Sequence, residues 1–175
     1  MNAAHGSSGL FRRPQPITPK SGQESVWDFP RPPRIERSSD RVIVKLGGQV
    51  IADTTDVVRV LETSHPPAYY LPMSSFPANV LVPAEGNTFC EFKGEAHYFD
   101  VVANGIVAPR AAWSYPNPAR GFETLRTRVA LYPSRMDSCE VNGEQVTFQD
   151  GDFYGGWITR RIVGPFKGGP GTARW

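Results

Sequence analysis

The chain has 175 residues, of which 39% are hydrophobic, so a single domain can bury a substantial core. Its 19 basic and 17 acidic residues give a formal net charge of +2, which provides no electrostatic argument for binding nucleic acid or a membrane surface. The sequence has neither an apolar run of the ~18 residues that a membrane helix needs nor the apolar core of a secretory signal, so we expect a cytoplasmic protein.

Residues 1–24 are rich in Gly, Ser and Pro and carry few large apolar groups, so we predict a disordered N-terminal tail. Residues 25–39 differ, because Trp27 and Phe29 stand among prolines that favour extended backbone. We predict an extended arm here, anchored by its two aromatic rings either on its own domain or on a second subunit.

The pattern of the central residues predicts short strands. Gly and Pro occur 17 times each, a density that disfavours long helices. Two apolar runs joined by Gly47-Gly48 predict a hairpin over 41–55. Further strands are predicted over 56–63 and 68–72, a short helical turn within 74–82, and a second hairpin about Gly94.

The C-terminal half continues the pattern, with strands predicted over 110–116, 128–133, 136–148 and 153–159. Asn142-Gly143 suits the tight turn of a hairpin. Residues 118–128 are the best helical candidate, of at most about three turns. Strands do not alternate with long helices, which disfavours a doubly wound nucleotide-binding sheet. We predict one all-β domain over 25–175, a compact antiparallel sheet curled into a barrel or tent-like sandwich with one or two short helices.

The two cysteines are expected to be reduced. Cys90 lies between apolar residues and is predicted to be a buried, inert thiol, whereas Cys139 is predicted to be exposed or half-buried on a strand. Neither has a CxxC partner, which argues against structural zinc. The sequence predicts no metal and no cofactor.

The first candidate site is the strand end at 61–66. If Leu61 packs inward, Glu62 faces a cavity or solvent. His65 is a candidate general acid or base, because the ordinary pKa of histidine is close to neutral. Ser64 adjoins His65 in sequence, which points the two side chains apart and argues against a catalytic triad. The alternative is that these side chains only satisfy backbone groups at a rigid corner before Pro66.

A second group surrounds Gly94. Glu91 and Lys93 share one face of a strand, and Lys93 can bind an anion or lower the pKa of a carboxyl group. The alternative is an exposed charge pair, worth less than about 1 kcal/mol. His97 is expected on the strand surface, and nothing in the spacing requires it to join Glu62 and His65 around a metal.

Aromatic residues complete a predicted pocket. Gly155-Gly156 removes side chains where another strand or a ligand must approach closely. Arginine from the arm is a candidate to close over a carboxylate or phosphate. Residues 167–172, KGGPGT, contain a further candidate lysine but lack the P-loop pattern. The ligand-binding candidates are Arg31, Arg34, Tyr69, Tyr70, Trp113, Tyr115, Trp157 and Lys167.

Several segments resemble a known family. The stretches SVWDFPRPPRIE, VLETSHPPAYYLP, TFCEFKGEAHYFDV and GFETLRTRVALYP, in this order between about Ser25 and Trp175, are similar to domain of unknown function family 427. The resemblance implies an all-β fold with a small cavity lined by aromatic and polar groups, but no established reaction. The family is sometimes labelled nucleotidyltransferase-like. That activity needs carboxylates that hold Mg²⁺, and the Asp residues here are scattered.

Two classes of function therefore stay open. The first is a binding domain for an unknown small molecule, with acid/base chemistry by Glu62 or His65 and Lys93 as electrostatic partner if it is an enzyme. The second is a non-enzymatic interaction module that binds a peptide or forms a homo-oligomer. A nucleotidyltransferase is the least favoured. Neither nucleic acid nor membrane is expected as a partner.

Overall fold

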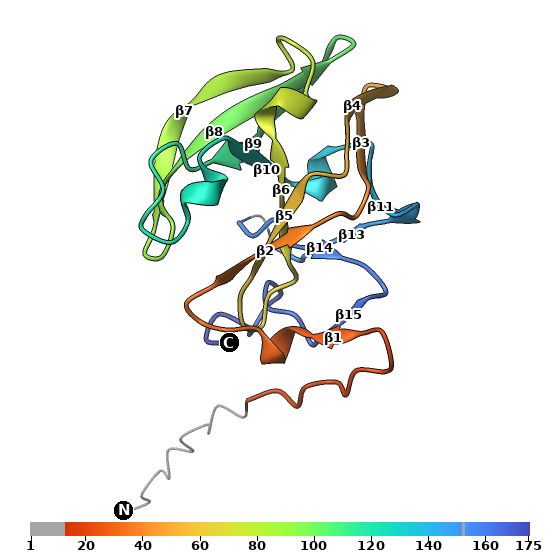
Figure 1. Cartoon of the computed structure of the whole chain (residues 1–175), viewed down its shortest axis with the longest axis vertical. Coiled ribbons are helices and arrows are strands. Elements are labelled where there is room, and N and C mark those ends of the chain that lie inside the picture. Colours follow the sequence, from red (N-terminus) through yellow and green to blue (C-terminus); the bar gives the residue numbers. More distant parts are fainter. Residues whose placement is uncertain (1–12, 152) are drawn as a thin grey trace, which may run out of the picture.

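Two antiparallel sheets form most of the computed structural model, which describes residues 13–151 and 153–175. The larger sheet has seven strands in the order β2-β5-β6-β10-β9-β8-β7, and the smaller has four in the order β12-β11-β3-β4 (Figure 1). The strands are β1 (Glu24–Ser25), β2 (Arg34–Ser38), β3 (Val42–Leu46), β4 (Gln49–Thr54), β5 (Val57–Leu61), β6 (Ala68–Pro72), β7 (Leu81–Cys90), β8 (Gly94–Ala103), β9 (Ile106–Ser114), β10 (Arg128–Leu131), β11 (Ser138–Val141), β12 (Glu144–Gln145), β13 (Thr147–Phe148), β14 (Trp157–Ile158) and β15 (Ile162–Val163).

Glycine and asparagine shape the two predicted tight hairpins, and the structure confirms both. Gly47 and Gly48 join β3 to β4 with φ of 61° and 71°, and Asn142-Gly143 joins β11 to β12 with φ of 49° and 81°. Both residues of such a turn need positive φ, which glycine adopts without steric cost and asparagine at low cost. The predicted hairpin about Gly94 is also present, between β7 and β8.

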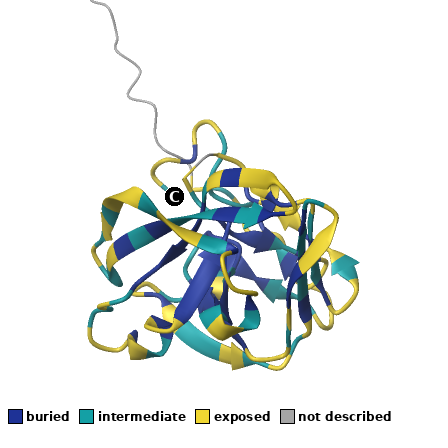
Figure 2. Ribbon diagram, turned by 90° about the horizontal axis from the view of Figure 1, so that it is seen from above, coloured by how far each residue is buried: buried dark blue, intermediate teal, exposed yellow. Residues whose placement is uncertain are grey.

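Strand alternation sorts the apolar side chains into two layers. On β6, Tyr69 and Leu71 point into a core shared by the two sheets, and Tyr70 points to the opposite face. Figure 2 shows buried stretches in the inner strands, and exposed stretches at loops and along parts of the outer strands. We call the second layer the aromatic cluster; it consists of Val58, Val60, Tyr70, Ala96, Tyr98, Trp113, Tyr115, Phe122, Leu125, Ala130 and Tyr132.

The predicted all-β class and curled antiparallel sheet are confirmed, but no sheet closes into a barrel. The predicted helix over 118–128 is wrong, because only η3 (Glu123–Leu125) forms there, as a 3-10 turn. Gly121 has φ of 93°, which no α-helix accommodates, and the remaining residues are too few to offset helix nucleation. The other 3-10 turns are η1 (Val26–Asp28), η2 (Met73–Ser75) and η4 (Pro133–Arg135), and the described residues contain no α-helix.

The N-terminal arm lies on its own domain. β1 pairs with β15 in parallel, so the arm runs beside the C-terminal segment (Figure 1). Phe29 is buried, and the indole Nε1–H of Trp27 donates to the main-chain oxygen of Pro165 at 2.9 Å. The predicted tail over 1–24 extends too far, because Ile17 N–H donates to Gly164 O at 2.8 Å and Glu24 belongs to β1. Residues 1–12 lie outside the described residues.

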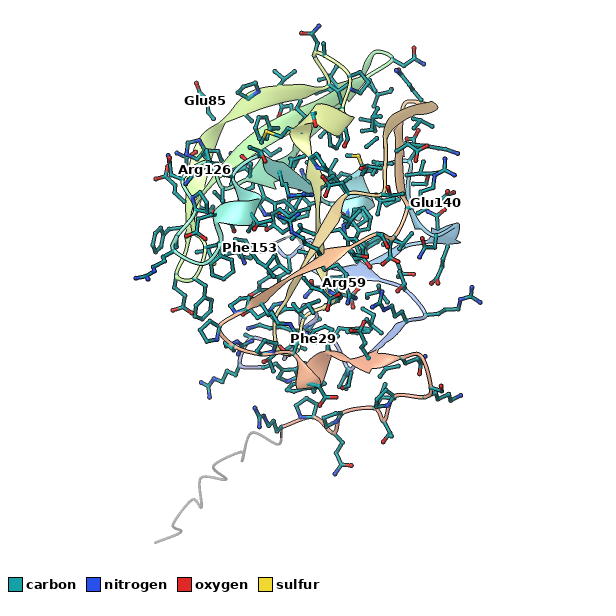
Figure 3. The ribbon with its side chains drawn as sticks, viewed as in Figure 1. Phe29, Arg59, Glu85, Arg126, Glu140 and Phe153 are labelled. Carbon is teal, nitrogen blue, oxygen red and sulfur yellow. The ribbon has the colours of Figure 1, made fainter. Side chains whose placement is uncertain are left out.

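A buried arginine attaches the arm to the large sheet. Arg59, in the middle of β5, is completely buried and forms ion pairs with Glu24 of β1 and Glu36 of β2. Figure 3 shows it between β1 and β2, above Phe29. Burying a guanidinium is unfavourable unless carboxylates neutralise it and accept its hydrogen bonds.

No helix among the described residues is long and apolar enough to cross a membrane.

Candidate functional site

A cavity of about 530 Å³ lies on the face of the seven-stranded sheet that carries the aromatic cluster. Its floor is formed by Tyr70 of β6, Tyr98 of β8 and Trp113 of β9. Three connecting parts of the chain form its walls: the corner at 62–66, the turn at 91–93, and Gln149 with residues 153–156. The site therefore combines a rigid strand floor with polar groups from loops.

The aromatic floor is held by hydrogen bonds as well as packing. Trp113 Nε1–H donates to the Tyr70 hydroxyl at 3.2 Å, and the Trp113 and Tyr132 rings lie 4.7 Å apart. The Tyr132 hydroxyl donates to Phe153 O at 2.9 Å. Burial raises the pKa of Tyr70, Tyr115 and Tyr132, the last to about 12, so these hydroxyl groups stay protonated at neutral pH. The floor is neutral and offers ring faces to a ligand.

His65 lies in the wall, with only 8% of its surface exposed. Its Nδ1 lies 3.1 Å from Nε2 of Gln149, and its ring meets that of Tyr154 edge to face at 4.6 Å. Burial, followed by the positive charges of Lys167, Arg31 and Lys93, lowers the pKa of His65 to about 3. His65 is therefore uncharged at neutral pH. Such a pKa is poorly matched to the expected role of general acid or base.

Glu62 and Arg31 form an ion pair at the cavity wall. Arg31 Nε lies 3.2 Å from Glu62 Oε1, and Arg31 Nη2 donates to Thr63 O at 2.9 Å. The guanidinium that was predicted to close over a ligand anion is thus engaged with protein oxygen atoms. Conversely, the arginine neutralises the carboxylate that was predicted to carry proton transfer.

Two lysines bring positive charge to the cavity. Lys93 Nζ lies 5.7 Å from the centre of the Tyr115 ring, and Lys167 Nζ lies at the same distance from the Tyr154 ring. Lys167 Nζ also donates to Trp175 O at 3.2 Å. Among the described residues, the Lys93 ammonium makes neither a hydrogen bond nor an ion pair. Lys93 is therefore the cation most available to a ligand.

Most of the predicted site residues line this cavity, and three do not. Tyr69 stacks on Trp157 at 4.8 Å in the core between the sheets, and Arg34 lies on the surface, 3.8 Å from Glu36. Tyr69 is excluded because its neighbour Tyr70 faces the cavity and successive strand residues point to opposite faces. The predicted residues that line the cavity are Arg31, Glu62, His65, Tyr70, Lys93, Trp113, Tyr115 and Lys167.

Other lining residues were not predicted. Tyr98 and Tyr132 follow from strand alternation once the cavity face is known. Gln149 carries no signal in the sequence, since its role depends on three groups that lie 7, 18 and 84 residues away along the chain. It accepts a hydrogen bond from Gly156 N–H at 3.1 Å and donates one to Lys167 O at 2.6 Å, besides contacting His65.

The predicted close approach at Gly155-Gly156 is confirmed. A Cβ atom on Gly155 would lie 2.3 Å from Cη2 of Trp113, and one on Gly156 would lie 2.4 Å from Oε1 of Gln149. Both glycines therefore let cavity-lining side chains reach the backbone, and any larger residue would displace them.

The two cysteines occupy the opposite environments to those predicted. Cys139 is buried in the core between the sheets, and its burial raises the pKa of the thiol to about 12. Cys90 is partly exposed and lines the cavity, because β7 ends there at the rim. His97 pairs with Glu95 at 3.2 Å and does not line the cavity with Glu62 and His65. Within the described residues, no three His, Cys, Asp or Glu side chains cluster as metal ligands do.

Comparisons with known proteins agree with the resemblance seen in the sequence. A family model described as Domain of unknown function (DUF427) matches residues 34–142, which is more than half of the chain. That range includes β2 through β11 and so most of the cavity floor. A search of curated proteins gave no match. The chain is therefore a member of the DUF427 family.

Proposed function

We propose that this domain binds a small molecule in the cavity above the aromatic cluster. The cavity itself supports the proposal: its volume of about 530 Å³ lies within the range of about 300–1,000 Å³ that is usual for small-molecule sites. Ring faces and a small number of converging polar groups are the lining that such sites share. A planar or cyclic ligand suits the walls best.

The polar groups favour binding over proton transfer. Arg31 forms an ion pair with Glu62 at 3.2 Å, and burial keeps His65 neutral. His65 is therefore not poised to exchange a proton near pH 7, and Glu62 is engaged with a guanidinium of the protein. Acid/base catalysis by these residues is therefore the weaker form of the proposal, and ligand binding is the stronger.

Thermal unfolding in the presence of a panel of nucleotides, sugars, amino acids and aromatic acids tests the proposal. A ligand at 100 times its dissociation constant adds about 2.7 kcal/mol to the free energy of unfolding, which raises the melting temperature visibly. Tyr154→Ala removes a cavity wall and should abolish the shift. Lys45→Ala, on β3 outside the cavity, is the matched control and should retain it. A ligand that stabilises wild type and Tyr154→Ala equally binds elsewhere and contradicts the assignment.

The rim of the cavity supports a second candidate. Phe89 and Phe153 both line the opening, with 78% and 63% of their surfaces exposed. Exposed aromatic rings of this kind mark interaction surfaces. The alternative function is therefore self-association, in which the rim packs against a second copy of the chain. Analytical ultracentrifugation tests it: a dimer that dissociates in the Phe89→Ser variant supports this reading, and a wild-type monomer at high concentration contradicts it.

A further inference from the structure

Gln149 determines which nitrogen of His65 carries the proton. The backbone N–H of Gly156 can only donate, so the Gln149 atom that it meets at 3.1 Å must be the amide oxygen. The other amide atom is then the nitrogen, which agrees with its distance of 2.6 Å from the Lys167 main-chain oxygen. The orientation of the Gln149 amide is thus fixed by one donor and one acceptor, both from the backbone.

An amide nitrogen only donates, so the Gln149 Nε2 that lies 3.1 Å from His65 Nδ1 must donate to it. Nδ1 is therefore the unprotonated nitrogen, and a neutral imidazole then carries its hydrogen on Nε2. Protonating Nδ1 would set two donors against each other. The contact with Gln149 thus opposes the charged form of His65 through geometry, independently of the effect of burial.

The Nε2–H group is free to meet a ligand. Among the described residues it has no hydrogen-bond partner, and Ser64 Oγ is the only unpartnered side-chain N or O atom there that is fully buried. The His65 Nε2 atom is therefore accessible, and the accessible space beside His65 is the cavity that it lines. A fixed, uncharged donor that faces a cavity suits an oxygen acceptor on a ligand.

The charges of the lining indicate the charge of that ligand. Arg31, Lys93 and Lys167 are cationic and Glu62 and Glu91 anionic, which leaves +1 with His65 neutral. The Arg31–Glu62 pair neutralises itself, and Lys93 has no carboxylate partner among the described residues. A single negative charge on the ligand would balance the net charge of the lining, whereas the two charges of a dianion would exceed it.

From this geometry we propose that the cavity binds a ring compound with one carboxylate, whose oxygen accepts the hydrogen bond of His65 Nε2–H and whose charge is balanced by Lys93. The ring would lie against Tyr70, Trp113 and Tyr115. Gln149 is a positioning residue, which acts by holding the imidazole in its donor form. This proposal rests on the proposed function and names the class of its ligand.

The tautomer can be tested without any ligand. Long-range ¹H–¹⁵N NMR spectra of the imidazole rings distinguish protonated from unprotonated nitrogen, and His65→Gln identifies the signals among the three histidines. We expect an unprotonated Nδ1 and a protonated Nε2 at pH 7, with no titration between pH 8 and pH 5. Gln149→Glu places an acceptor beside Nδ1 and should move the proton to that nitrogen. A wild-type His65 protonated on Nδ1 at pH 7 would overturn the proposal.

Ligand class is tested with one ring and three head groups: naphthalene carboxylate, naphthalene carboxamide and naphthyl phosphate, titrated by NMR at pH 7. We expect the carboxylate to bind at least tenfold more tightly than the other two. Lys93→Met and His65→Leu should each weaken it about tenfold, and His65→Gln should retain binding because the glutamine amide still donates. Affinity should be constant from pH 6 to pH 8, whereas a charged imidazolium would lose about tenfold per pH unit above about 6.5.

The outcomes separate this proposal from the proposed function. Equal binding of carboxylate and carboxamide, tighter binding of the phosphate, or affinity that falls steeply above pH 6.5 would overturn the ligand class while the binding function stands. If none of the three probes shifts any cavity resonance and the ligand panel also gives no thermal shift, both proposals fail. A carboxylate-specific shift in wild type that Lys93→Met removes supports both.

Discussion

The guanidinium of Arg59 donates to both carboxylate oxygens of Glu24, at 3.0 and 3.2 Å, and so connects β1 to β5, next to the edge strand of the seven-stranded sheet. Burial alone would raise the pKa of Glu24, but the hydrogen bonds and charges of Arg59 and Arg161 outweigh it and the pKa is lowered. The two side chains thus stabilise each other's charged forms. The pair explains why the ordered domain begins before residue 25.

Glu24→Gln should lower the free energy of unfolding by about 2 kcal/mol at pH 7, because a buried guanidinium then loses one of its two carboxylates. Urea unfolding measures the change. Glu85→Gln, on an exposed part of β7, is the control and should stay within about 0.5 kcal/mol of wild type. Because the folded pKa of Glu24 is lowered, its contribution is present above the ordinary value of 4.5 and lost as the pH falls below it. An equal cost of the substitution at pH 3 and pH 7 would contradict this role.

His65 should make the protein less stable in mild acid. Its folded pKa of about 3 lies below the ordinary 6.5, so between these values the unfolded chain binds a proton that the folded chain does not. Protonation of this residue in the unfolded chain should therefore lower the free energy of unfolding by about 2 kcal/mol from pH 7 to pH 5. Burial, and then the positive charges of Lys167, Arg31 and Lys93, oppose its protonation in the folded chain. Urea unfolding at the two pH values should show this decrease in wild type and lose it in His65→Gln. His97→Gln should retain it, and a flat wild-type profile would argue against a buried neutral His65.

Gly155→Ala should distort the cavity floor. The new methyl group would lie 2.3 Å from Cη2 of Trp113, and the indole must move to relieve the overlap. We expect a loss of about 1–3 kcal/mol and a changed near-ultraviolet circular dichroism spectrum, which reports on Trp packing. Gly169→Ala is the comparison, since its Cβ would meet nothing closer than 3.6 Å and its φ is not positive. Identical spectra for wild type and Gly155→Ala would show that the Trp113 ring does not pack tightly against Gly155.

The native protein should react with one equivalent of a thiol reagent, and that thiol should be Cys90. Cys90 is partly exposed at the cavity, whereas Cys139 is buried and burial raises the pKa of its thiol to about 12. Titration with Ellman's reagent before and after denaturation should give one thiol and then two. Cys90→Ser should leave none reactive in the native state, and a slower reaction in the presence of a cavity ligand would place that ligand beside β7.

The sequence by itself determined the class of fold and the hairpins. Gly47-Gly48 and Asn142-Gly143 permit the positive φ of a tight turn whatever surrounds them, so local chemistry was sufficient there. The helix predicted over 118–128 failed because Gly121 adopts a positive φ and the residues after it are too few for a helix of their own; Phe122 and Leu125 are instead buried in the aromatic cluster. The family could be recognised from the sequence because its motifs are continuous along the chain.

Only the tertiary structure decided which residues share the site. Tyr69 and Tyr70 are the same residue type side by side in the sequence. The pairing of β6 between β5 and β10 points Tyr69 into the core and Tyr70 into the cavity. Which thiol is buried depends likewise on the assembled sheets: Cys139 lies within β11 and faces the core, whereas Cys90 ends β7 at the cavity. Gln149 approaches His65 across 84 residues, and no local pattern encodes such a contact. Local rules fix the turns and the alternation of strands, but the chemistry of the cavity depends on contacts that exist only once the sheets have assembled.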